Sequence, residues 1–471
     1  MRQIISDIIE MLRGTTDLIQ FEEDLKLYMF ETMSEALGDV LTEINQTMKK
    51  NRCDEGWENV HTDSKTVNFS FGPVTYRHTT MRDGRGTLRH PLNEWLGIGK
   101  YQRHSALVEV KVAEMATEMD YRETARVLKE WTAVDMSHAT VANIVKRVGK
   151  KQADTDQHMV EALDAADCLP EGKKVDVLFV EADGVFVRGI KRRKSIEVSQ
   201  AIVYEGWSQN GKRVALKAPM VVMSTEAIDD FWNEVQTMTA MTYSLEQTQV
   251  VANSDGGVGY GEERFKTTFS QSSKEVLCQI DKYHVSQAII RTFGAKKSDM
   301  KTHIKKAIEA HDRDEFILWM DTYESTEDDP KKLKRLSDFK TYILNHWHRY
   351  FDWRDKVADV PDGARTLGAM ESNQRRVSYR MKKRGMHWSQ AGALGMVKLL
   401  QARANKTLRS MYLNHSALSQ YKQKDMKKSV RMSYHLSQKT RPSVGAIQGG
   451  IPINGANSSA IGQLVKSLSL S

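Results

Sequence analysis

The order of strand-like and helical segments between residues 175 and 290 constrains the fold of this 471-residue chain most strongly. Three apolar segments with strand character come first, and helices then alternate with two more strands. The pattern predicts strands at residues 175–182, 196–207, 214–224, 248–255 and 275–284. It predicts one helix at about 227–245, a short helix after strand four, and another helix from residue 285. Because connections are short and crossovers are right-handed, few sheets accommodate this order.

Three antiparallel strands, followed by parallel strands that are joined by helices, form the order of the ribonuclease-H-like fold. We therefore predict an α/β catalytic domain on a mixed five-stranded sheet, with an all-α insertion. Asp183 follows strand one in VEADGVFV, and Asp255 ends strand four in VVANSDGG. Strands one and four are neighbours in this fold, so both carboxylates are expected at one edge of the sheet.

Two carboxylates at one edge are typical of a site for Mg²⁺ or Mn²⁺, which prefer oxygen ligands. The predicted third ligand is Glu371, which begins a helix in LGAMESNQRR. Two metal ions about 4 Å apart support an in-line displacement at phosphorus. Asp183 and Asp255 each precede a glycine, so an ordinary turn is the alternative for each of them. Asp359 and Asp362 are alternatives to Glu371.

Further side chains are predicted close to the acids. Glu181 shares a side of strand one with Asp183 and is a candidate auxiliary acid. His284, at the end of strand five in DKYH, is a candidate to orient a phosphate or the attacking water. A structural role is the alternative for this histidine. Arg375 and Lys382 share a helical face with the third acid and are predicted to bind DNA phosphates, with a solvated basic face as the alternative.

Residues 104–150 predict three helices that resemble a helix-turn-helix. The second begins after Asp120 and the third begins after Ser137. The third helix has an apolar face, and its other face carries the candidate DNA-binding residues His138, Thr140, Asn143 and Arg147. A polar last helix after a tight connection is typical of a unit that reads DNA, and plain helix packing is the alternative.

Charge is distributed unevenly along the chain. The net charge is +8, but residues 371–441 hold 17 Lys and Arg against 2 Asp and Glu, a local balance of +15. Such a block favours a polyanion as partner, because contacts with phosphates release counterions. The alternative is a solvated helix face.

Several function classes are not indicated. The chain has no P-loop, so ATP is not implied, and no G-x-S-x-G elbow of a serine hydrolase. No apolar run approaches the ~20 residues of a membrane span. The three cysteines are far apart, which argues against a zinc knuckle or a disulfide framework. We expect a cytoplasmic, nucleoid-associated protein with no membrane partner.

The chain divides into seven predicted regions. They are an N-terminal helical arm (1–50), a small β-hairpin region (51–100), the helix-turn-helix-like region (101–150), the catalytic core (170–295), an all-α insertion (296–362), a basic helical segment that completes the core (363–441), and a flexible tail (442–471).

The motifs together resemble a DDE transposase, and more narrowly the ISLre-type insertion-sequence transposases of bacteria, which overlap a family long called uncharacterised. The stretches that carry the resemblance are VEADGVFV, NSDGGVGY, DKYHVSQAI and LGAMESNQRRVSYRMKKRGMHWS. The resemblance implies Asp183, Asp255 and Glu371 as the catalytic triad. It also implies that the stretch between the last two acids, which are 116 positions apart, contains a helical insertion.

The activity that this resemblance implies is cutting at terminal inverted repeats and joining of the free 3′-hydroxyl to target DNA. Double-stranded DNA is then the partner, and the chain is expected to act as a homodimer or a larger assembly. Two alternatives remain open at this point: a DNA-binding protein with an inactive catalytic fold, and another ribonuclease-H-like nuclease.

Overall fold

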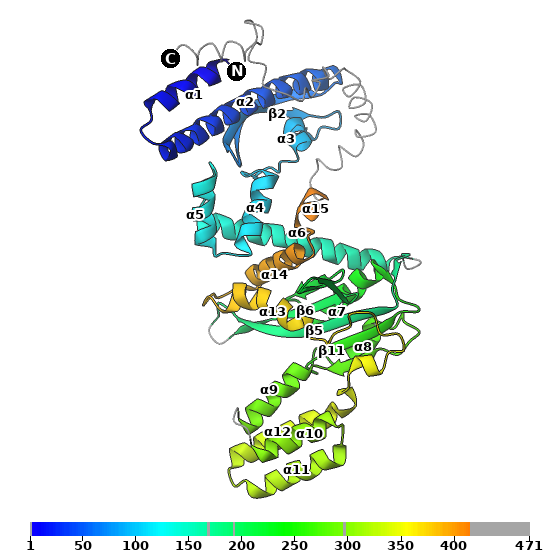
Figure 1. Cartoon of the computed structure of the whole chain (residues 1–471). Coiled ribbons are helices and arrows are strands. Elements are labelled where there is room, and N and C mark those ends of the chain that lie inside the picture. The colour runs from blue at the N-terminus through cyan, green and yellow to red at the C-terminus, as the bar shows by residue number, and fades with distance from the viewer. Residues whose placement is uncertain (1, 167–169, 192–193, 295–297, 415–471) are drawn as a thin grey trace, which may run out of the picture. The chain divides into compact units, whose positions relative to one another are not determined.

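The computed structural model describes residues 2–166, 170–191, 194–294 and 298–414 (Figure 1). These residues all belong to one compact unit, residues 1–415. Part of the predicted basic segment, 415–441, and the predicted tail, 442–471, lie outside the described residues.

A five-stranded mixed sheet lies at the centre of the fold, in the order β12-β11-β5-β6-β9. β5, β6 and β9 pair antiparallel, whereas β5, β11 and β12 run parallel. The strand bounds are Val177–Arg188 for β5, Ser195–Tyr204 for β6, Met220–Ser224 for β9, Gln249–Ser254 for β11 and Leu277–Ile280 for β12. The predicted α/β class and the mixed five-stranded sheet are therefore confirmed.

The observed strands differ in extent from the predicted ones, most of all strands one and three. β5 continues through Asp183 to Arg188, because β6 pairs with it as far as that residue. Asp183 thus lies inside the strand and not at its end. The predicted strand 214–224 is broken: Arg213–Leu216 (β8) forms a separate hairpin with Trp207–Asn210 (β7), and only β9 joins the sheet.

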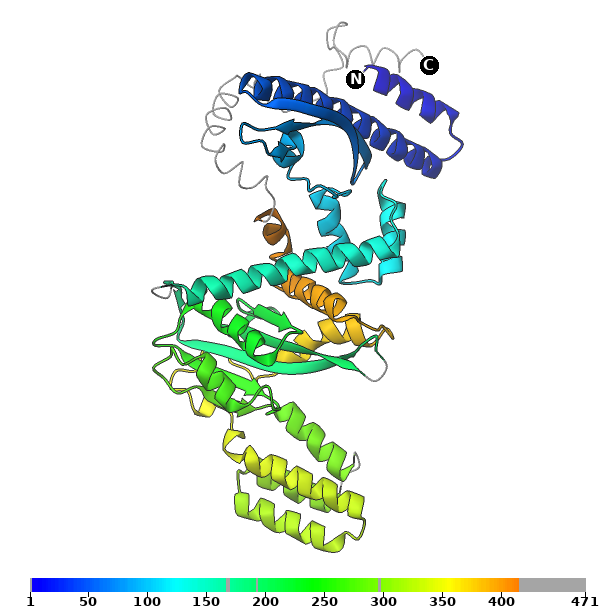
Figure 2. The same ribbon diagram turned by 180° about the vertical axis from the view of Figure 1, so that it is seen from behind.

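Each face of the sheet has its own apolar core. On one face, Val177 and Phe179 of β5 pack in the core that also contains residues of α14 (Gln390–Ala404), which lies beside the 27-residue α6 (His138–Asp164) (Figures 1 and 2). Leu178 and Val180 point to the opposite face, where the core contains residues of α7 (Ile228–Ala240) and α8 (Glu262–Thr268). This alternation is the period-2 pattern of a strand that is buried on both faces.

α6 and α14 cross at two glycines. A Cβ atom on Gly149 would lie 2.2 Å from the carbonyl oxygen of Gly395, so no larger residue fits there. Near this crossing, the buried Lys398 ammonium donates to the carboxylates of Asp156 (2.7 Å) and Glu234 (2.5 Å). The three charges link α6, α7 and α14 within the core.

A separate helical unit follows the sheet. α9 (Lys282–Phe293) packs with the later helices of this unit around buried Phe316 and Phe339. Helix α9 thus shares this core, and the helical unit begins before the predicted boundary at residue 296. Its other members are α10 (Asp299–Glu309), α11 (Arg313–Thr326), α12 (Pro330–Asn345) and the 3₁₀ turn Trp347–Arg349. The 3₁₀ turn Trp353–Asp355 follows, and its Trp353 is buried in the core of the central sheet.

The N-terminal region contains two long elements. α2 (Leu18–Asp54) packs on the hairpin of β1 (Glu58–Phe69) and β2 (Gly72–Arg82) around Leu41, Val74 and Tyr76. The β-hairpin predicted within residues 51–100 is present. The remaining elements are α1 (Arg2–Gly14), β3 (Leu88–Arg89), α3 (Pro91–Leu96), α4 (Ala106–Ala116), α5 (Tyr121–Trp131), β4 (Lys173–Lys174), β10 (Tyr243–Ser244), α13 (Ala369–Val377), a π-helical turn (Ser378–Lys382) and α15 (Leu408–Asn414). Over the described ranges, every helix is too short or too polar to cross a membrane.

Candidate functional site

Asp183 lies on β5 just beyond the part of the strand that pairs with β11. That pairing ends at Glu181 and Asn253, so β5 extends two residues past its parallel neighbour before it reaches Asp183. The carboxylate is nearly buried. β11 itself ends at Ser254, directly before Asp255. The two acids therefore come from adjacent parallel strands, as the strand order predicts.

Three groups approach the carboxylate of Asp183. The backbone N–H of Gly184 donates to Oδ1 at 2.7 Å, and the side-chain amide of Gln374 on α13 donates to Oδ2. The Nε2 atom of His284 lies 3.7 Å from the same Oδ2. Burial and the negative charge of Asp255 raise the pKa of Asp183 to about 6. The electrostatic effect indicates that the two carboxylates lie near one another.

Asp255 is held by a turn of two glycines. Its Oδ1 accepts a hydrogen bond from the Gly257 N–H at 2.8 Å, and its backbone carbonyl accepts one from the Tyr342 hydroxyl at 3.2 Å. Gly256 has φ +78°, and a Cβ atom there would lie 2.6 Å from the His346 ring. Asp255 is thus a turn residue whose carboxylate also lies at the sheet edge. The turn that was the alternative for this residue is therefore compatible with a role as a site acid.

Glu371 is not gathered with the two aspartates. It lies in the first turn of α13, its side chain is 52% exposed, and its carboxylate is 3.5 Å from the guanidinium of Arg375. Gln374, three residues later and therefore on the same side of the helix, is the residue of α13 that reaches Asp183. Among the described residues, no group of three or more His, Cys, Asp or Glu side chains is arranged to hold one metal ion.

Glu181 has a different role from the auxiliary acid predicted for it. It is fully buried and accepts hydrogen bonds from the Tyr204 hydroxyl (2.7 Å) and the Asn253 amide (3.2 Å). It also accepts the backbone N–H groups of Gly368, Ala369 and Met370, at 3.1, 2.9 and 3.2 Å. These N–H groups begin α13, so Glu181 caps this helix from the sheet. An acid within an apolar strand was the only signal for it in the sequence.

His284 lies in the first turn of α9 and not at the end of a strand. The strand β12 ends at Ile280, and the side chain of Asp281 caps the helix by accepting the Tyr283 N–H at 2.8 Å. The first turn of α9 nevertheless brings the imidazole to Asp183, where it was expected. Gln374 could not be predicted as a site residue, because no sequence pattern marks an amide that lies beside basic residues.

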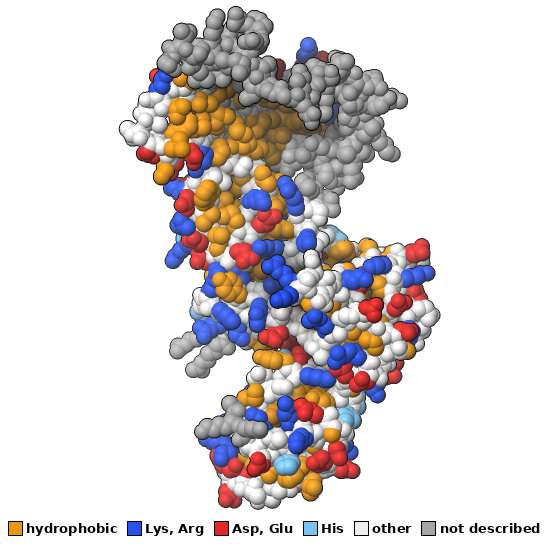
Figure 3. Space-filling view, viewed as in Figure 1, with side chains coloured by type: hydrophobic (Ala, Val, Ile, Leu, Met, Phe, Trp, Pro, Cys, Tyr) orange, Lys and Arg blue, Asp and Glu red, His pale blue; other side chains and the backbone are white. Residues whose placement is uncertain are grey.

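Arg375 and Lys382 are both exposed, on α13 and the π-helical turn that follows it. Lys and Arg side chains gather over the region of α13 and α14 in Figure 3. The exposed basic residues of this segment are Arg375, Arg376, Lys382, Lys383 and Arg384. The guanidinium of Arg384 lies over the exposed Tyr379 ring at 4.5 Å. This segment, which we call the basic face, is continuous in sequence with Gln374.

The three helices predicted between 104 and 150 are present, but the last one runs on to Asp164. His138 and Asn143 are exposed. Thr140 belongs to the helix cap, since its N–H donates to the Ser137 hydroxyl at 3.2 Å. Arg147 is paired with the buried Glu109 carboxylate. The apolar side of α6 lies in the same core as one face of the central sheet, so packing accounts for that side of the helix.

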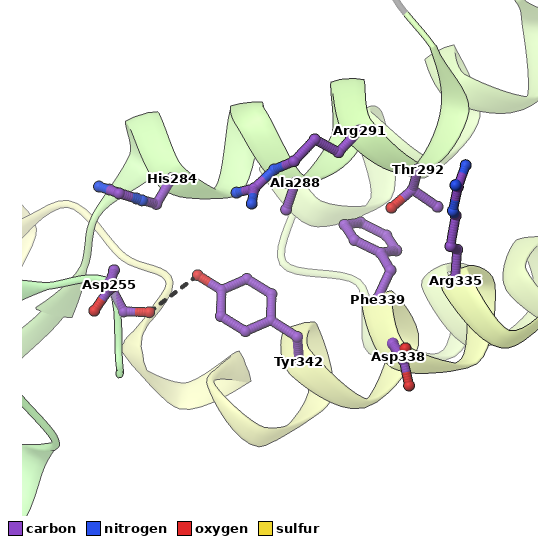
Figure 4. A pocket seen from close by; sticks show the side chains of 9 residues that line it. All are labelled: Asp255, His284, Ala288, Arg291, Thr292, Arg335, Asp338, Phe339 and Tyr342. Carbon is purple, nitrogen blue, oxygen red and sulfur yellow. Dashed lines mark hydrogen bonds between the residues drawn. The ribbon is translucent and has the colours of Figure 1, made fainter. Parts of the chain in front are cut away.

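A pocket of about 640 Å³ opens beside Asp255 (Figure 4). Residues of α9 line one wall, and residues of α12 line the other. Asp255 and His284 lie together at one end of it. The lining residues are Asp255, His284, Ala288, Arg291, Thr292, Arg335, Asp338, Phe339 and Tyr342.

Comparison with known proteins gives the family. The model of the uncharacterised protein family UPF0236 matches residues 13–413. The chain belongs to this family. A Streptococcus gallolyticus relative, named UPF0236 protein in vanSb 3′ region, is 30% identical over 469 residues, which is 98% of this chain and 99% of that protein.

More distant UPF0236 relatives come from Caldanaerobacter subterraneus subsp. tengcongensis. One is 22% identical over 401 residues, 84% of this chain and 79% of its own length. Another is 22% identical over 404 residues, 84% of this chain and 80% of its own length, and its name joins eleven locus labels.

This result corrects the family assignment made from the motifs. The matching family is UPF0236 and not the ISLre-type insertion-sequence transposases. Its description and the names of these relatives state no activity.

Proposed function

We propose that this UPF0236 chain catalyses metal-dependent phosphoryl transfer on DNA, with strand cleavage and strand transfer as in DNA transposition. The observation that carries the proposal is the pair Asp183 and Asp255. They come from adjacent parallel strands, and the charge of Asp255 contributes to the raised pKa of Asp183. Paired carboxylates with a perturbed pKa beside a pocket are a common arrangement at catalytic sites.

The donor set fits a divalent cation. Asp183 and Asp255 offer hard oxygen ligands, and the repulsion between them is what a cation would offset. Mg²⁺ or Mn²⁺ would be held by these two acids, with Glu371 as the proposed third ligand after a change of its side-chain rotamer. When bound, the ion would supply charge stabilisation to the phosphoryl oxygens.

The surrounding side chains have roles that follow from their contacts. Gln374 fixes the orientation of the Asp183 carboxylate. His284, at 3.7 Å from that carboxylate, is in position to orient the attacking oxygen or to accept its proton. Arg375 and Lys382 on the basic face would bind phosphates of the DNA backbone, since both are exposed cations on the segment that carries Gln374.

Two further observations support the proposal. The order β12-β11-β5-β6-β9, with only β6 antiparallel to both neighbours, is the order expected for a ribonuclease-H-like fold. The name of one Caldanaerobacter relative joins eleven locus labels. A name of this kind is expected when the same protein is encoded at many positions. Transposition would place copies of one coding region at many positions.

A second candidate function is DNA binding without catalysis. The observation that favours it concerns Glu371, the proposed third ligand. Its side chain is half-exposed and forms an ion pair with Arg375. In this case His138, Asn143 and the basic face would bind double-stranded DNA, and Asp183 would have no catalytic role.

The copies of the chain would meet through the N-terminal helices. Large apolar side chains are exposed there, and Figure 3 shows them gathered over α1 and α2. They include Ile5, Ile9, Leu12, Leu18, Ile19 and Leu27. A homodimer that buries this surface would explain the exposure, and light scattering of wild type and of Leu12→Glu tests it.

The test of the main proposal is strand cleavage of DNA that carries the chain's own gene with its flanking sequences. Wild type should cut in Mg²⁺ or Mn²⁺ and not in EDTA. Asp183→Asn and Asp255→Asn should both lose cutting, whereas Asp314→Asn, an exposed acid in the first turn of α11, should keep it. Equal cutting by wild type and Asp183→Asn would overturn the proposal. Tight DNA binding by all variants, with no cutting by any, would favour the second candidate.

A further inference from the structure

The pocket between α9 and α12 has a chemical character of its own. Its wall includes two guanidinium groups and two aromatic rings, and one of its ends is formed by Asp255 and His284 (Figure 4). We propose that this pocket binds one unpaired nucleotide of the DNA strand that is cut, next to the phosphate at the acids. The inference rests on the proposed function for the identity of the strand.

The phosphate ligands would be Arg291 and Arg335. Arg291 lies on α9 and is exposed, and its Nε donates to the carbonyl of Gln287 at 3.3 Å, one helical turn earlier. No carboxylate of the described residues lies within ion-pair distance of Arg291. Arg335 on α12 is exposed, and no acid lies within ion-pair distance of it in the described part of the chain. A guanidinium that has no carboxylate partner keeps its donors for a phosphate.

Phe339 and Tyr342 lie along α12 between Arg335 and Asp255, and Arg291 approaches Tyr342 from α9 (Figure 4). Phe339 points toward α9, and Tyr342 points toward Asp255, whose carbonyl accepts its hydroxyl at 3.2 Å. Phe339 is buried in the core of the helical unit, so the half-buried ring of Tyr342 is the one on which an unpaired base would stack beside the cations.

The volume of the pocket fits an unpaired nucleotide but not a double helix. A pocket of about 640 Å³ is in the range of sites for small molecules and nucleotides. A double helix, with a major groove that is itself about 12 Å wide, does not enter such a space. The acid Asp338 belongs to the lining, but its carboxylate points away from α9 in Figure 4 and so does not oppose a phosphate between the two helices.

The position of the pocket relates it to the reaction. Asp255 both lines the pocket and belongs to the proposed acid pair, so a strand that crosses the acids would place the adjoining nucleotide between α9 and α12. A base that occupies the pocket is no longer paired in a duplex. The helical unit would therefore separate the strands at the cleavage position, which a site for intact duplex does not need.

The experiment measures binding of fluorescent DNA in EDTA, where no cutting takes place. The probes are a short single-stranded oligonucleotide, a blunt duplex of the same sequence, and a deoxynucleoside 5′-monophosphate as competitor. The variants are Arg291→Ala, Arg335→Ala and the double variant, with Lys334→Ala as the matched control. Lys334 is an exposed cation next to Arg335, and it is not part of the pocket.

We expect each Arg variant to weaken binding of the single strand about tenfold and to leave duplex binding within twofold. Lys334→Ala should bind like wild type, and all variants should unfold at the wild-type temperature because the changed residues are exposed. The monophosphate should compete only weakly.

Equal loss of single-strand and duplex binding would overturn the inference, as would single-strand binding that the double variant leaves unchanged. A monophosphate that binds as tightly as the oligonucleotide would also overturn it, since the pocket would then be a site for free nucleotides. Asp183→Asn separates the two proposals: it should keep single-strand binding even though it loses cutting. If wild type binds single strands through Arg291 and never cuts, the proposed function fails while the pocket assignment stands.

Discussion

Glu181 and Asp183 lie two residues apart on the same side of β5, but their carboxylates have different partners. Glu181 accepts the first backbone N–H groups of α13, whereas Asp183 accepts the amide of Gln374 from the same helix. One acid holds the helix in place, and the other meets its side chain at the candidate site. The strand therefore positions both its own carboxylate and the helix that approaches it.

This relationship predicts that Glu181→Gln is strongly destabilising. The variant loses the negative charge that five donors surround, and its amide N–H₂ group adds donors where acceptors are needed. We expect a loss of about 2–4 kcal/mol in the free energy of unfolding, measured by urea denaturation.

The matched control is Glu371→Gln on α13. Its carboxylate is half-exposed in a surface ion pair with Arg375, so stability should change by less than about 1 kcal/mol. Similar losses in the two variants would contradict the capping role of Glu181.

The raised pKa of Asp183 predicts a pH-dependent stability. The carboxyl has a folded pKa of about 6, above the ordinary value of about 3.9. Its stabilising contribution is thus complete below about pH 4, where it is protonated, and is lost as the pH rises through 6. In EDTA we expect Asp183→Asn to be more stable than wild type above pH 6, by about 1–3 kcal/mol.

Urea denaturation at several pH values between 4 and 8 measures this difference. The two proteins should have equal stability near pH 4, and the gap should open between pH 4 and 6. A variant that is less stable than wild type at pH 7 would show that the Asp183 carboxylate is not held under electrostatic repulsion.

Divalent metal should stabilise wild type through the same residues. An ion that binds only the folded chain adds about 2.7 kcal/mol at a hundred times its Kd. We expect Mg²⁺ or Mn²⁺ to raise the melting temperature of wild type and of Asp314→Asn, and to leave Asp183→Asn and Asp255→Asn unchanged. Differential scanning fluorimetry makes this comparison, and equal shifts in all four proteins would place metal binding elsewhere.

The buried charge of Lys398 predicts a large effect in the core. Lys398→Met leaves Asp156 and Glu234 without their cation, and these carboxylates are almost entirely buried. The cost should be about 3–5 kcal/mol of unfolding free energy. Lys150→Met, at an exposed position on α6, is the control and should stay near wild type. A core that tolerates the Lys398 change would mean that the two acids are protonated together.

The strand order of the sheet could be predicted because its apolar runs are uninterrupted and its turns are marked by glycine and polar residues. The extent of β5 could not, since Asp183 and Gly184 have low strand propensity and only pairing with β6 keeps them extended. The same holds for α6: residues 150–164 lack a clear apolar stripe, and contact with α14 decides their conformation.

The candidate site was predictable only in part. Asp183, Asp255 and His284 stand out because acids and a histidine follow apolar segments, and the structure brings them together. Gln374 and the pocket on α9 and α12 depend on side chains from segments far apart in the sequence, which no local pattern joins. Glu371 was selected as an acid at a helix start, but the same sequence places Arg375 one turn away to pair with it.

The capping of α13 by Glu181 has a consequence for how the chain is made. The donor at Gly368 is 187 residues downstream of its acceptor, so β5 leaves the ribosome long before the helix that it caps. Until residue 374 has emerged, Asp183 lacks the amide that orients it, and Glu181 lacks the helix start that it holds. A nascent or truncated chain that ends before α13 thus contains the five strands of the sheet but lacks the residues that complete the candidate site.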